Sequence, residues 1–543
     1  MPVPSVFASE HEARPELLEQ SPKVSPLTER LSRGGTYCLV PNGPPSSLGG
    51  RVRQSGTLSP ERNNTRVAKG SYQRMSSPRV VFAICAVLVT SALPAHAAYN
   101  AVVQWQDAVE QVVRTYNISN QISAKFYALT NIAQYQALLA NKAQGNKIND
   151  TAVTAFAAHY VLSYYWPYRQ NVFDAIIAKQ LASVPASEKL AARTLAQPYA
   201  IKLIVSRVND STQQWADFKP ASAENGPMGE YAFTPNQTFV LYPQLANATT
   251  LATPKANPPP SQQAGAAFAQ YSNADTLTVG PAQTFFSTKL TQYKPLDLNS
   301  AEYADDFNTT ATLGSKNSTA RKEYDTETAW FWADLDGTST VNGHYYTIAK
   351  SLLPNDTSLL DTAELFARLG SAQFDSNIVG WYIKFYYLFW RPVTAIRRGD
   401  ARHPADPTWT PLLSTPAHPE YPSTHTVTAA ASGQVLAKWF KSDNVTFTVS
   451  SEYAPKKLAP RTYHSFSEAA TEVGWSRVYG GIHFPKSGPD GAGVGTKVGD
   501  TVSDNFPAAV DSIFGTSFAA AHAADNNSSS PSPKAATGRR LFA

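Results

Sequence analysis

Lys384 and Arg391 are the first side chains whose types and spacing suit anion chemistry. They frame the run Lys384-Phe-Tyr-Tyr-Leu-Phe-Trp-Arg391-Pro392. Seven residues are nearly two helical turns, so we expect both cations on one helix face, about 10 Å apart along the axis. Pro392 disfavours helix at Arg391 and would place the guanidinium at a helix end. Taken alone, this segment is also typical of two solvated cations beside an aromatic core stripe.

The segment His418-Pro-Glu-Tyr-Pro-Ser423-Thr424-His425 leads into a helix-compatible run from Thr426 to Phe440. Ser423 stands at the position of a helix N-cap, so the free N–H groups of the first turn and the positive end of the helix dipole would face an adjoining ligand. This arrangement predicts an anion site. Plain helix capping with a bystander histidine is the alternative.

The segment Ser476-Arg477-Val-Tyr-Gly-Gly-Ile-His483 follows a helix that we expect to begin at Ser465. Its glycine pair can adopt left-handed conformations, so the helix should end there and the chain should turn. The turn would bring His483 to the same pocket as Arg477. A purely structural turn is the alternative for this segment alone.

Together, the three segments supply three cations, a hydroxyl, oriented amides and two imidazoles. This set suits a tetrahedral oxyanion that passes to a trigonal bipyramid. Cations and amides would neutralise the equatorial oxygens, and the two imidazoles would serve the two apical positions. The sequence therefore predicts one oxyanion site, built from Lys384, Arg391, Ser423, His425, Arg477 and His483.

In this order, the segments resemble the tripartite signature shared by vanadium-dependent haloperoxidases, bacterial acid phosphatases and type 2 phosphatidic acid phosphatases. The likeness is greatest to the haloperoxidases and includes Ala329-Trp-Phe-Trp-Ala333 and Phe389-Trp-Arg-Pro-Val-Thr-Ala-Ile396. It covers about 99–515 and is most specific over 320–495. The resemblance implies an all-α fold, a helical double bundle that holds one vanadate.

The resemblance also implies a role for each site residue. His483 would coordinate vanadium, and His425 would act as acid and base at the opposite apical oxygen. Hydrogen peroxide would oxidise a halide to hypohalous acid, with the metal as Lewis acid, and a small organic acceptor would take up the halogen. The residues implied to bind the vanadate are Lys384, Arg391, Ser423, Thr424, Arg477 and His483.

Two positions depart from the family pattern. Thr424 stands where the family usually has Gly, and its side chain is expected to crowd the anion although its N–H remains available. Ser487 stands four residues after His483, where the family usually has an Asp that orients the histidine. Asp490 lies nearby in the sequence, and we consider it as the carboxylate that replaces this Asp in orienting His483.

Two further residues bear on the choice of halide. Trp381 matches a tryptophan that lines the halide pocket of the chloroperoxidase type. His418 matches a histidine of algal bromoperoxidases, where chloroperoxidases have Phe. The pair favours bromide or iodide, whereas core packing of Trp381 and a turn role for His418 are the alternatives.

Helices must position these residues. Apolar side chains such as Val102, Trp105, Val109 and Val112 recur at three- and four-residue steps from the start of the body, which predicts amphipathic helices. A Pro-, Asn- and Thr-rich stretch, 218–297, is expected to be a long surface excursion. The expected helical segments are 119–142, 152–182, 186–215, one beginning near 300, 322–335, 357–391, 424–441, 464–480 and 496–514.

Charge and cysteine content exclude several function classes. Residues 1–97 hold 11 of the 46 basic and 6 of the 41 acidic residues, so the rest of the chain holds 35 of each. Without a basic excess we expect no nucleic-acid partner. Cys38 and Cys85 both precede residue 98. The body therefore has no disulfide, cysteine nucleophile, zinc–thiolate site or iron–sulfur cluster.

The N-terminal segments predict export. Arg79, an apolar run over 80–93 and Ala95-His96-Ala97 are typical of a secretory signal. The run is shorter than the roughly 20 residues that span a bilayer, so we expect no membrane association beyond the signal peptide. The expected organisation is a disordered or upstream extension (1–74), a signal peptide (75–97), a helical haloperoxidase-like domain (98–520, catalytic half about 320–515) and a disordered tail (521–543).

Asn-x-Ser/Thr triplets in the body support a secreted, glycosylated protein. They begin at Asn117, Asn149, Asn209, Asn236, Asn247, Asn308, Asn317, Asn355 and Asn444.

Two other functions stay open from the sequence. An acid phosphatase would use His483 as nucleophile, because phosphate and vanadate are nearly isosteric. A non-catalytic secreted glycoprotein of the same fold would have lost vanadate binding through Thr424 and Ser487. The halide, the organic acceptor and the oligomeric state also stay open.

Overall fold

The structure of the chain is a computed structural model that describes residues 100–212, 218–234, 266–335, 337–452 and 458–515. The signal segment, both cysteines, Asn236, Asn247 and the two expected disordered ends lie outside the described residues. Nothing in the structure tests the expected domain boundaries, which stay predictions.

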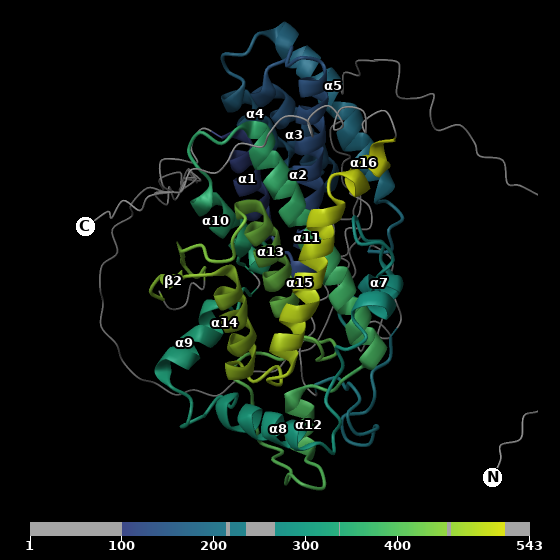
Figure 1. Cartoon of the computed structure of the whole chain (residues 1–543), viewed down its shortest axis with the longest axis vertical. Helices are drawn as coiled ribbons and strands as arrows, with labels where there is room; N and C mark the ends of the chain where they lie inside the picture. Colours follow the sequence, from purple (N-terminus) through teal and green to yellow (C-terminus); the bar gives the residue numbers. More distant parts are fainter. Residues whose placement is uncertain (1–99, 213–217, 235–265, 336, 453–457, 516–543) are drawn as a thin grey trace, which may run out of the picture. The chain divides into compact units, whose positions relative to one another are not determined.

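Helices form nearly all regular structure in the described ranges (Figure 1), which confirms the all-α prediction. A small sheet within the described residues pairs β1 (Phe447–Val449) with β2 (Arg461–Tyr463) in antiparallel register. None of the described helices is both long enough and apolar enough to span a membrane. The helices are α1 (Ala101–Thr115), α2 (Asn120–Ala143), α3 (Asp150–Tyr165), η1 (Pro167–Arg169), α4 (Gln170–Gln180), α5 (Ala186–Ser206), η2 (Ala269–Asn273), α7 (Ala282–Lys289), α8 (Ala301–Leu313), α9 (Glu323–Phe331), α10 (Thr340–Leu352), α11 (Leu359–Tyr387), α12 (Pro392–Arg398), α13 (Thr424–Phe440), α14 (Phe466–Tyr479), α15 (Ser487–Asn505) and α16 (Ala508–Phe514).

Several expected boundaries were wrong. The segment expected as one helix over 152–182 is broken at Pro167, which cannot donate a backbone hydrogen bond and starts a new 3-10 turn. The helix expected from 496 begins nine residues earlier, at Ser487. The stretch 218–297 is not entirely a surface excursion, because its described part contains α7, with Phe285 and Phe286 buried.

The long helix α11 crosses the buried helix α2 at very short range. Ser358 caps the start of α11 by accepting a hydrogen bond from the backbone N–H of Asp361. A Cβ placed on Gly370 would lie 2.7 Å from the Cα atom of Ala128 on α2. Only glycine leaves room for the two backbones at this crossing, so the α11–α2 packing depends on that residue.

Helices α11, α13 and α15 lie against one another (Figure 1). Glycines at four-residue steps form one face of α15, and that face contacts the backbone of α13. A Cβ on Gly495 would lie 2.2 Å from the carbonyl oxygen of Val427, and one on Gly499 would lie 2.7 Å from that of Ala431. The close packing holds the first turn of α13, which begins after Ser423, against the start of α15.

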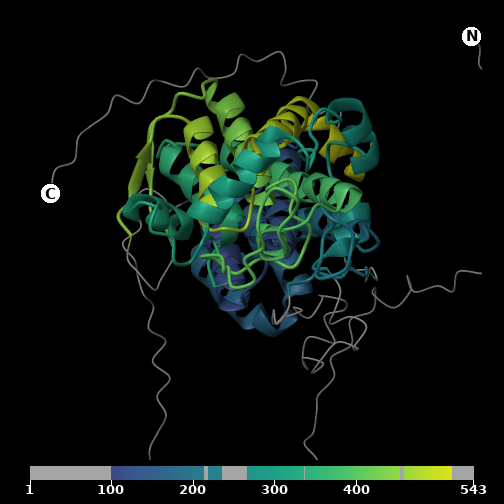
Figure 2. The ribbon, with the colours of Figure 1, turned by 90° about the horizontal axis from the view of Figure 1, so that it is seen from below.

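Figure 2 looks onto the end of these helices where the connection from α12 to α13 lies. This connection runs from 399 to 423 and carries His418 and Ser423. Backbone hydrogen bonds tie it to two other segments: Glu420 N–H donates to the Phe389 carbonyl, and Ser423 N–H donates to the Ser487 carbonyl. The three segments singled out in the sequence therefore meet at this end of the helices.

Candidate oxyanion site

The cations Lys384 and Arg391 do not share a helix face, contrary to the sequence prediction. Helix α11 ends at Tyr387, and Leu388 takes a left-handed conformation with a φ of 50°. Arg391 is extended and forms the N-cap of α12, as the following proline favours. Both side chains are fully buried, so the alternative of solvated cations is also wrong.

The ammonium of Lys384 is fully occupied by carbonyl groups. It donates to the backbone oxygens of Pro419 at 3.0 Å, Glu420 at 2.8 Å and Pro422 at 2.5 Å. A lysine has three N–H donors, and these contacts use all of them. In this arrangement Lys384 holds the segment before Ser423 in place and contributes its charge to the site, rather than a direct hydrogen bond to an anion.

Arg391 joins the two histidine-bearing segments. Its Nε donates to the His418 carbonyl at 2.9 Å, and its NH1 group donates to the Ile482 carbonyl at 2.8 Å. NH1 also lies 3.1 Å from Nε2 of His483, and NH2 lies 3.0 Å from Nδ1 of His418. Because a guanidinium can only donate, both of these ring nitrogens act as acceptors.

Ser423 is the N-cap of α13, as predicted, but its hydroxyl makes no capping bond to the helix. The Ser423 hydroxyl instead accepts a hydrogen bond from the Thr426 hydroxyl at 2.9 Å. The amide groups of the first turn therefore lack a side-chain cap from Ser423, which is the condition under which a helix N-terminus attracts an anion.

The Thr424 side chain is accommodated by a glycine on α11. An atom at the Cβ position of Gly380 would lie 3.4 Å from Cγ2 and 3.5 Å from Oγ1 of Thr424. The side chain expected to crowd the anion therefore lies against the α11 backbone. Its Oγ1 atom is buried without a hydrogen-bond partner.

His425 contacts the segment 332–335 that follows α9. Its Nε2 lies 3.3 Å from the Ala333 carbonyl oxygen, which can only accept a hydrogen bond. Nε2 is therefore the N–H of the neutral ring, and Nδ1 keeps its lone pair. A lone pair on Nδ1 suits the predicted role of a general base.

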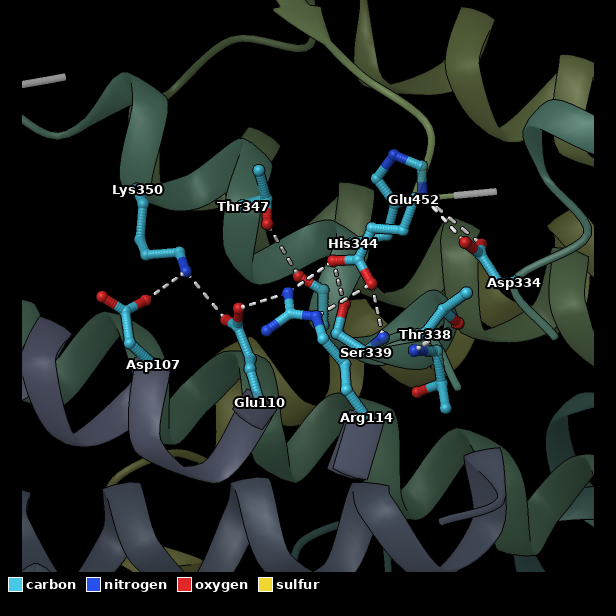
Figure 3. A network of polar contacts seen from close by, with 12 residues as sticks. Asp107, Glu110, Arg114, Asp334, Thr338, Ser339, His344, Thr347, Lys350 and Glu452 are labelled. Carbon is cyan, nitrogen blue, oxygen red and sulfur yellow. Dashed lines mark hydrogen bonds and ion pairs between the residues drawn. The ribbon is translucent and has the colours of Figure 1, made fainter. Parts of the chain in front are cut away.

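Arg477, near the end of α14, contacts the same segment. Its NH1 group donates to the Trp332 carbonyl at 3.2 Å, and its Nε atom is buried without a partner. The carboxylate of Asp334, a side chain with little solvent exposure, opposes the charge of Arg477. Asp334 in turn pairs with Nδ1 of His344 at 3.1 Å (Figure 3). The sequence analysis did not identify Asp334, although it lies directly after the quoted Ala329–Ala333 motif.

Glu420 is the second residue that the sequence analysis missed. Its carboxylate accepts a hydrogen bond from Nδ1 of His483 at 2.8 Å. Asp490, the substitute considered from the sequence, makes no such contact. It instead accepts hydrogen bonds from the Tyr421 hydroxyl at 2.5 Å and the Lys486 ammonium at 3.0 Å. Glu420 is the only carboxylate between Asp406 and Asp443, and it lies within the proline-rich motif 418–422. This position was the one sequence feature that could have identified Glu420 as a site residue.

The electrostatics of the site favour neutral imidazoles. Burial lowers the pKa of His483 well below its usual value, and Arg391 and Lys384 lower it further. Burial also lowers the pKa of His425, with a further contribution from Arg477. The same burial lowers the pKa of Arg477 to about 10 although Asp334 opposes the shift. Near pH 7 both histidines therefore offer lone pairs beside the charged guanidinium groups of Arg391 and Arg477.

The residues present fit a bound oxyanion. Lys384, Arg391 and Arg477 are buried together, whereas Glu420 and Asp334 are the opposing carboxylates that the contacts above provide. Buried cations are stabilised by anions, so this excess of positive charge favours a negatively charged ligand. The buried Arg477 Nε atom is a donor without an acceptor, which an oxyanion would supply.

Trp381 and His418 lie side by side at this site. Their ring centroids are 4.7 Å apart, and the Trp381 indole N–H donates to the Ala267 carbonyl at 3.2 Å. Nδ1 of His418 is also 3.2 Å from the Pro419 carbonyl, but the shorter contact comes from Arg391. The neutral ring therefore carries its proton on Nε2, where it can donate to an anion.

Comparisons with known proteins agree with this geometry. Residues 364–512 match the family model described as the VCPO second helical-bundle domain. A vanadium chloroperoxidase from Curvularia inaequalis is 26% identical over 166 residues, a match that spans 26% of this chain and 27% of the length of that relative.

Solved structures extend the likeness over most of the chain. A bacterial vanadium-dependent iodoperoxidase superposes with a TM-score of 0.60 at 20% identity, covering 75% of this chain and 96% of the other. A bacterial vanadium-dependent chloroperoxidase in its holo form gives a TM-score of 0.55 at 14% identity, with the same coverage.

The resemblance found in the sequence is thus confirmed. The chain has the fold of the vanadium haloperoxidases, and its residues 364–512 are similar to the second helical-bundle domain of the VCPO family.

Proposed function

We propose that this protein is a secreted vanadate-dependent haloperoxidase, which uses hydrogen peroxide to oxidise a halide to hypohalous acid. A small organic acceptor then takes up the halogen. The observation that carries the proposal is the state of His483. Its Nδ1 donates to a buried carboxylate, its Nε2 keeps a lone pair, and Nε2 faces the guanidinium of Arg391 among buried cations.

His483 is the residue that would coordinate vanadium through Nε2. The oxygens of the vanadate would be neutralised by Arg391, Arg477 and the first-turn amides of α13. Lys384, which donates to carbonyls of the segment 419–422, would contribute its positive charge without contacting the vanadate. Bound vanadate would supply a Lewis acid that activates hydrogen peroxide. His425, with its basic Nδ1, would accept and return the proton exchanged at the apical oxygen.

Trp381 and His418 support bromide or iodide as the halide. The Nε2–H of His418 is a neutral donor in a buried pocket, beside the indole ring of Trp381. Larger and less strongly hydrated halides lose less hydration energy when they enter such a pocket, so chloride is disfavoured relative to bromide or iodide.

The test is an assay of the full-length chain after incubation with orthovanadate. We expect bromination of monochlorodimedone when hydrogen peroxide and bromide are both present, and none when vanadate is omitted. A different result would support the phosphatase alternative: no bromination, together with phosphate ester hydrolysis by the vanadate-free protein and a phosphohistidine at His483.

Secretion is supported by the position of the glycosylation triplets. Every triplet asparagine within the described residues has an exposed side chain: Asn117, Asn149, Asn209, Asn308, Asn317, Asn355 and Asn444. We expect the protein from a eukaryotic secretory host to lose mass on treatment with an N-glycosidase. An unchanged mass, with the protein retained inside the cells, would contradict export.

A further inference from the structure

The carboxylate of Glu420 collects donors from a single stretch of chain. The Oε1 atom accepts from His483 Nδ1 at 2.8 Å and from the Phe484 backbone N–H at 3.0 Å, and Oε2 accepts from the Ser487 hydroxyl at 2.8 Å. The Glu420 side chain is fully buried. Both oxygens are therefore directed to the segment 483–487, and the orientation of the carboxylate is defined from two sides.

The backbone of Glu420 is anchored just as firmly to a different segment. Its N–H donates to the Phe389 carbonyl at 2.9 Å, and its carbonyl accepts from the Lys384 ammonium at 2.8 Å. Glu420 thus connects the end of α11 with the turn after α14. A side chain held at its backbone and at both oxygens can define the position of a neighbouring ring.

The contact with Glu420 determines which nitrogen of His483 is available. A carboxylate only accepts hydrogen bonds, so it keeps the proton on Nδ1 and leaves the lone pair on Nε2. Arg391 NH1 donates to that lone pair at 3.1 Å, which is consistent with the same tautomer. An imidazole that binds a metal oxyanion, or attacks phosphorus, needs this arrangement.

We propose that Glu420 is the positioning residue of His483 and that Ser487 acts as its hydrogen-bond donor. The carboxylate orients the ring and selects the Nε2 lone pair, and the Ser487 hydroxyl keeps the carboxylate turned toward the ring. The proposal rests on the proposed function only in taking His483 as the imidazole that contacts the oxyanion.

The decisive variant is Glu420→Gln, which keeps the shape of the side chain and removes its charge. The first measurement is the equilibrium dissociation constant for orthovanadate, determined by calorimetry without peroxide or halide. We expect affinity to fall by about 10- to 100-fold, as is usual when the partner of a ligating histidine is lost. Asp490→Asn is the matched control, because it neutralises a buried carboxylate whose contacts are Tyr421 and Lys486, and its affinity should stay within about 3-fold of the parent.

The second measurement reports the ring directly. In protein labelled with ¹⁵N-histidine, the His483 signals of the parent should show the proton on Nδ1. Glu420→Ala, which removes the acceptor of the Nδ1 proton, should shift the population toward the Nε2–H tautomer, whereas Asp490→Asn should not. A merely structural role for Glu420 would leave this tautomer unchanged.

A rescue variant tests the geometry. Because the Ser487 hydroxyl lies 2.8 Å from the Glu420 carboxylate, an aspartate at 487 can occupy the space vacated in a Glu420→Ala background. The double variant Glu420→Ala/Ser487→Asp should recover at least about 10-fold of the affinity lost in Glu420→Ala.

Some outcomes would overturn the proposal. One is unchanged vanadate affinity in Glu420→Gln together with an unchanged tautomer in Glu420→Ala, and another is an equal loss of affinity in Asp490→Asn. If the haloperoxidase proposal is wrong, the measurements give results that differ from these. A parent protein that binds vanadate but does not oxidise bromide refutes the haloperoxidase activity and leaves both Glu420 measurements readable. If the parent binds no vanadate, the tautomer measurement alone decides whether Glu420 positions His483.

Discussion

The His483→Ala variant is expected to lower vanadate affinity and the rate of bromide oxidation by about 100- to 1,000-fold, the range for removing one preorganised group from such a site. His483 is the site imidazole whose Nδ1 donates to a carboxylate and whose Nε2 lone pair lies beside the buried Arg391 guanidinium. Its removal also leaves the Glu420 carboxylate without the imidazole N–H, and Arg391 NH1 loses the Nε2 acceptor but keeps the Ile482 carbonyl. The measurements are vanadate titration and the bromination assay.

The matched control is His403→Ala. His403 is also a buried histidine with a carboxylate partner, since its Nδ1 lies 2.8 Å from Asp400 and its ring stacks on Phe307 at 4.1 Å. Because it makes these contacts outside the oxyanion site, the variant should keep vanadate affinity within about 3-fold of the parent. Vanadate binding by His483→Ala as tight as that of the parent would contradict the assigned ligand.

The Glu452→Gln variant is expected to lower the free energy of unfolding by about 3 kcal/mol at pH 7. Glu452 joins α1 to the start of α10 (Figure 3): it accepts hydrogen bonds from Arg114 at 2.5 and 3.1 Å and from the Ser339 N–H and hydroxyl at 2.6 and 2.7 Å. Burial alone would raise the pKa of Glu452, but Arg114 and Ser339 outweigh it and lower the pKa to about 2. The shift from the ordinary value of 4.5 sets the size of the expected loss.

The pH dependence of this contribution has a definite sign. The folded state holds the Glu452 carboxylate ionised to lower pH than the unfolded state, so the unfolded state takes up the proton first as pH falls. The stabilisation is complete above the unfolded pKa of about 4.5 and is lost as pH falls toward 2. Urea unfolding of parent and Glu452→Gln should therefore differ most at pH 6–7 and by roughly half as much near pH 3.

A control separates this effect from loss of any negative charge. Glu188, in the first turn of α5, is exposed, so Glu188→Gln should change the free energy of unfolding by less than about 1 kcal/mol at either pH. Equal stability losses for the two variants, or a Glu452→Gln loss that does not diminish on acidification, would contradict the assigned role of the Arg114–Glu452–Ser339 contacts.

The helix ends around the site were predictable because their signals are local. Ser423 and Ser465 both stand immediately before a helix, and Ser465 accepts a capping hydrogen bond from Glu468 N–H. Helix α14 ends at the glycine pair, where Gly481 takes a φ of 71°. Capping and glycine conformations depend on residues within a few positions of each other, so the sequence carries this information directly.

The geometry between Lys384 and Arg391 was not predictable in the same way. Helical spacing would hold only if the helix continued, but it ends at Tyr387 because Leu388 turns the chain and Glu230 and Phe389 form an isolated bridge. The Lys384 ammonium then meets three carbonyls some 35 residues later in the chain. Which acceptors a buried cation finds depends on contacts between segments, and residue spacing does not report them.

The sequence by itself determined the residue types of the site, the helical class of the chain and the places where the helices that carry Ser423 and Arg477 begin. Only the tertiary structure decided that Glu420, rather than Asp490, meets His483, that Gly380 accommodates Thr424, and that Asp334 lies behind Arg477. The physical reason is range: hydrogen bonds within one helical turn are set by neighbouring residues, whereas the partner of a buried charge is set by which distant segments pack together.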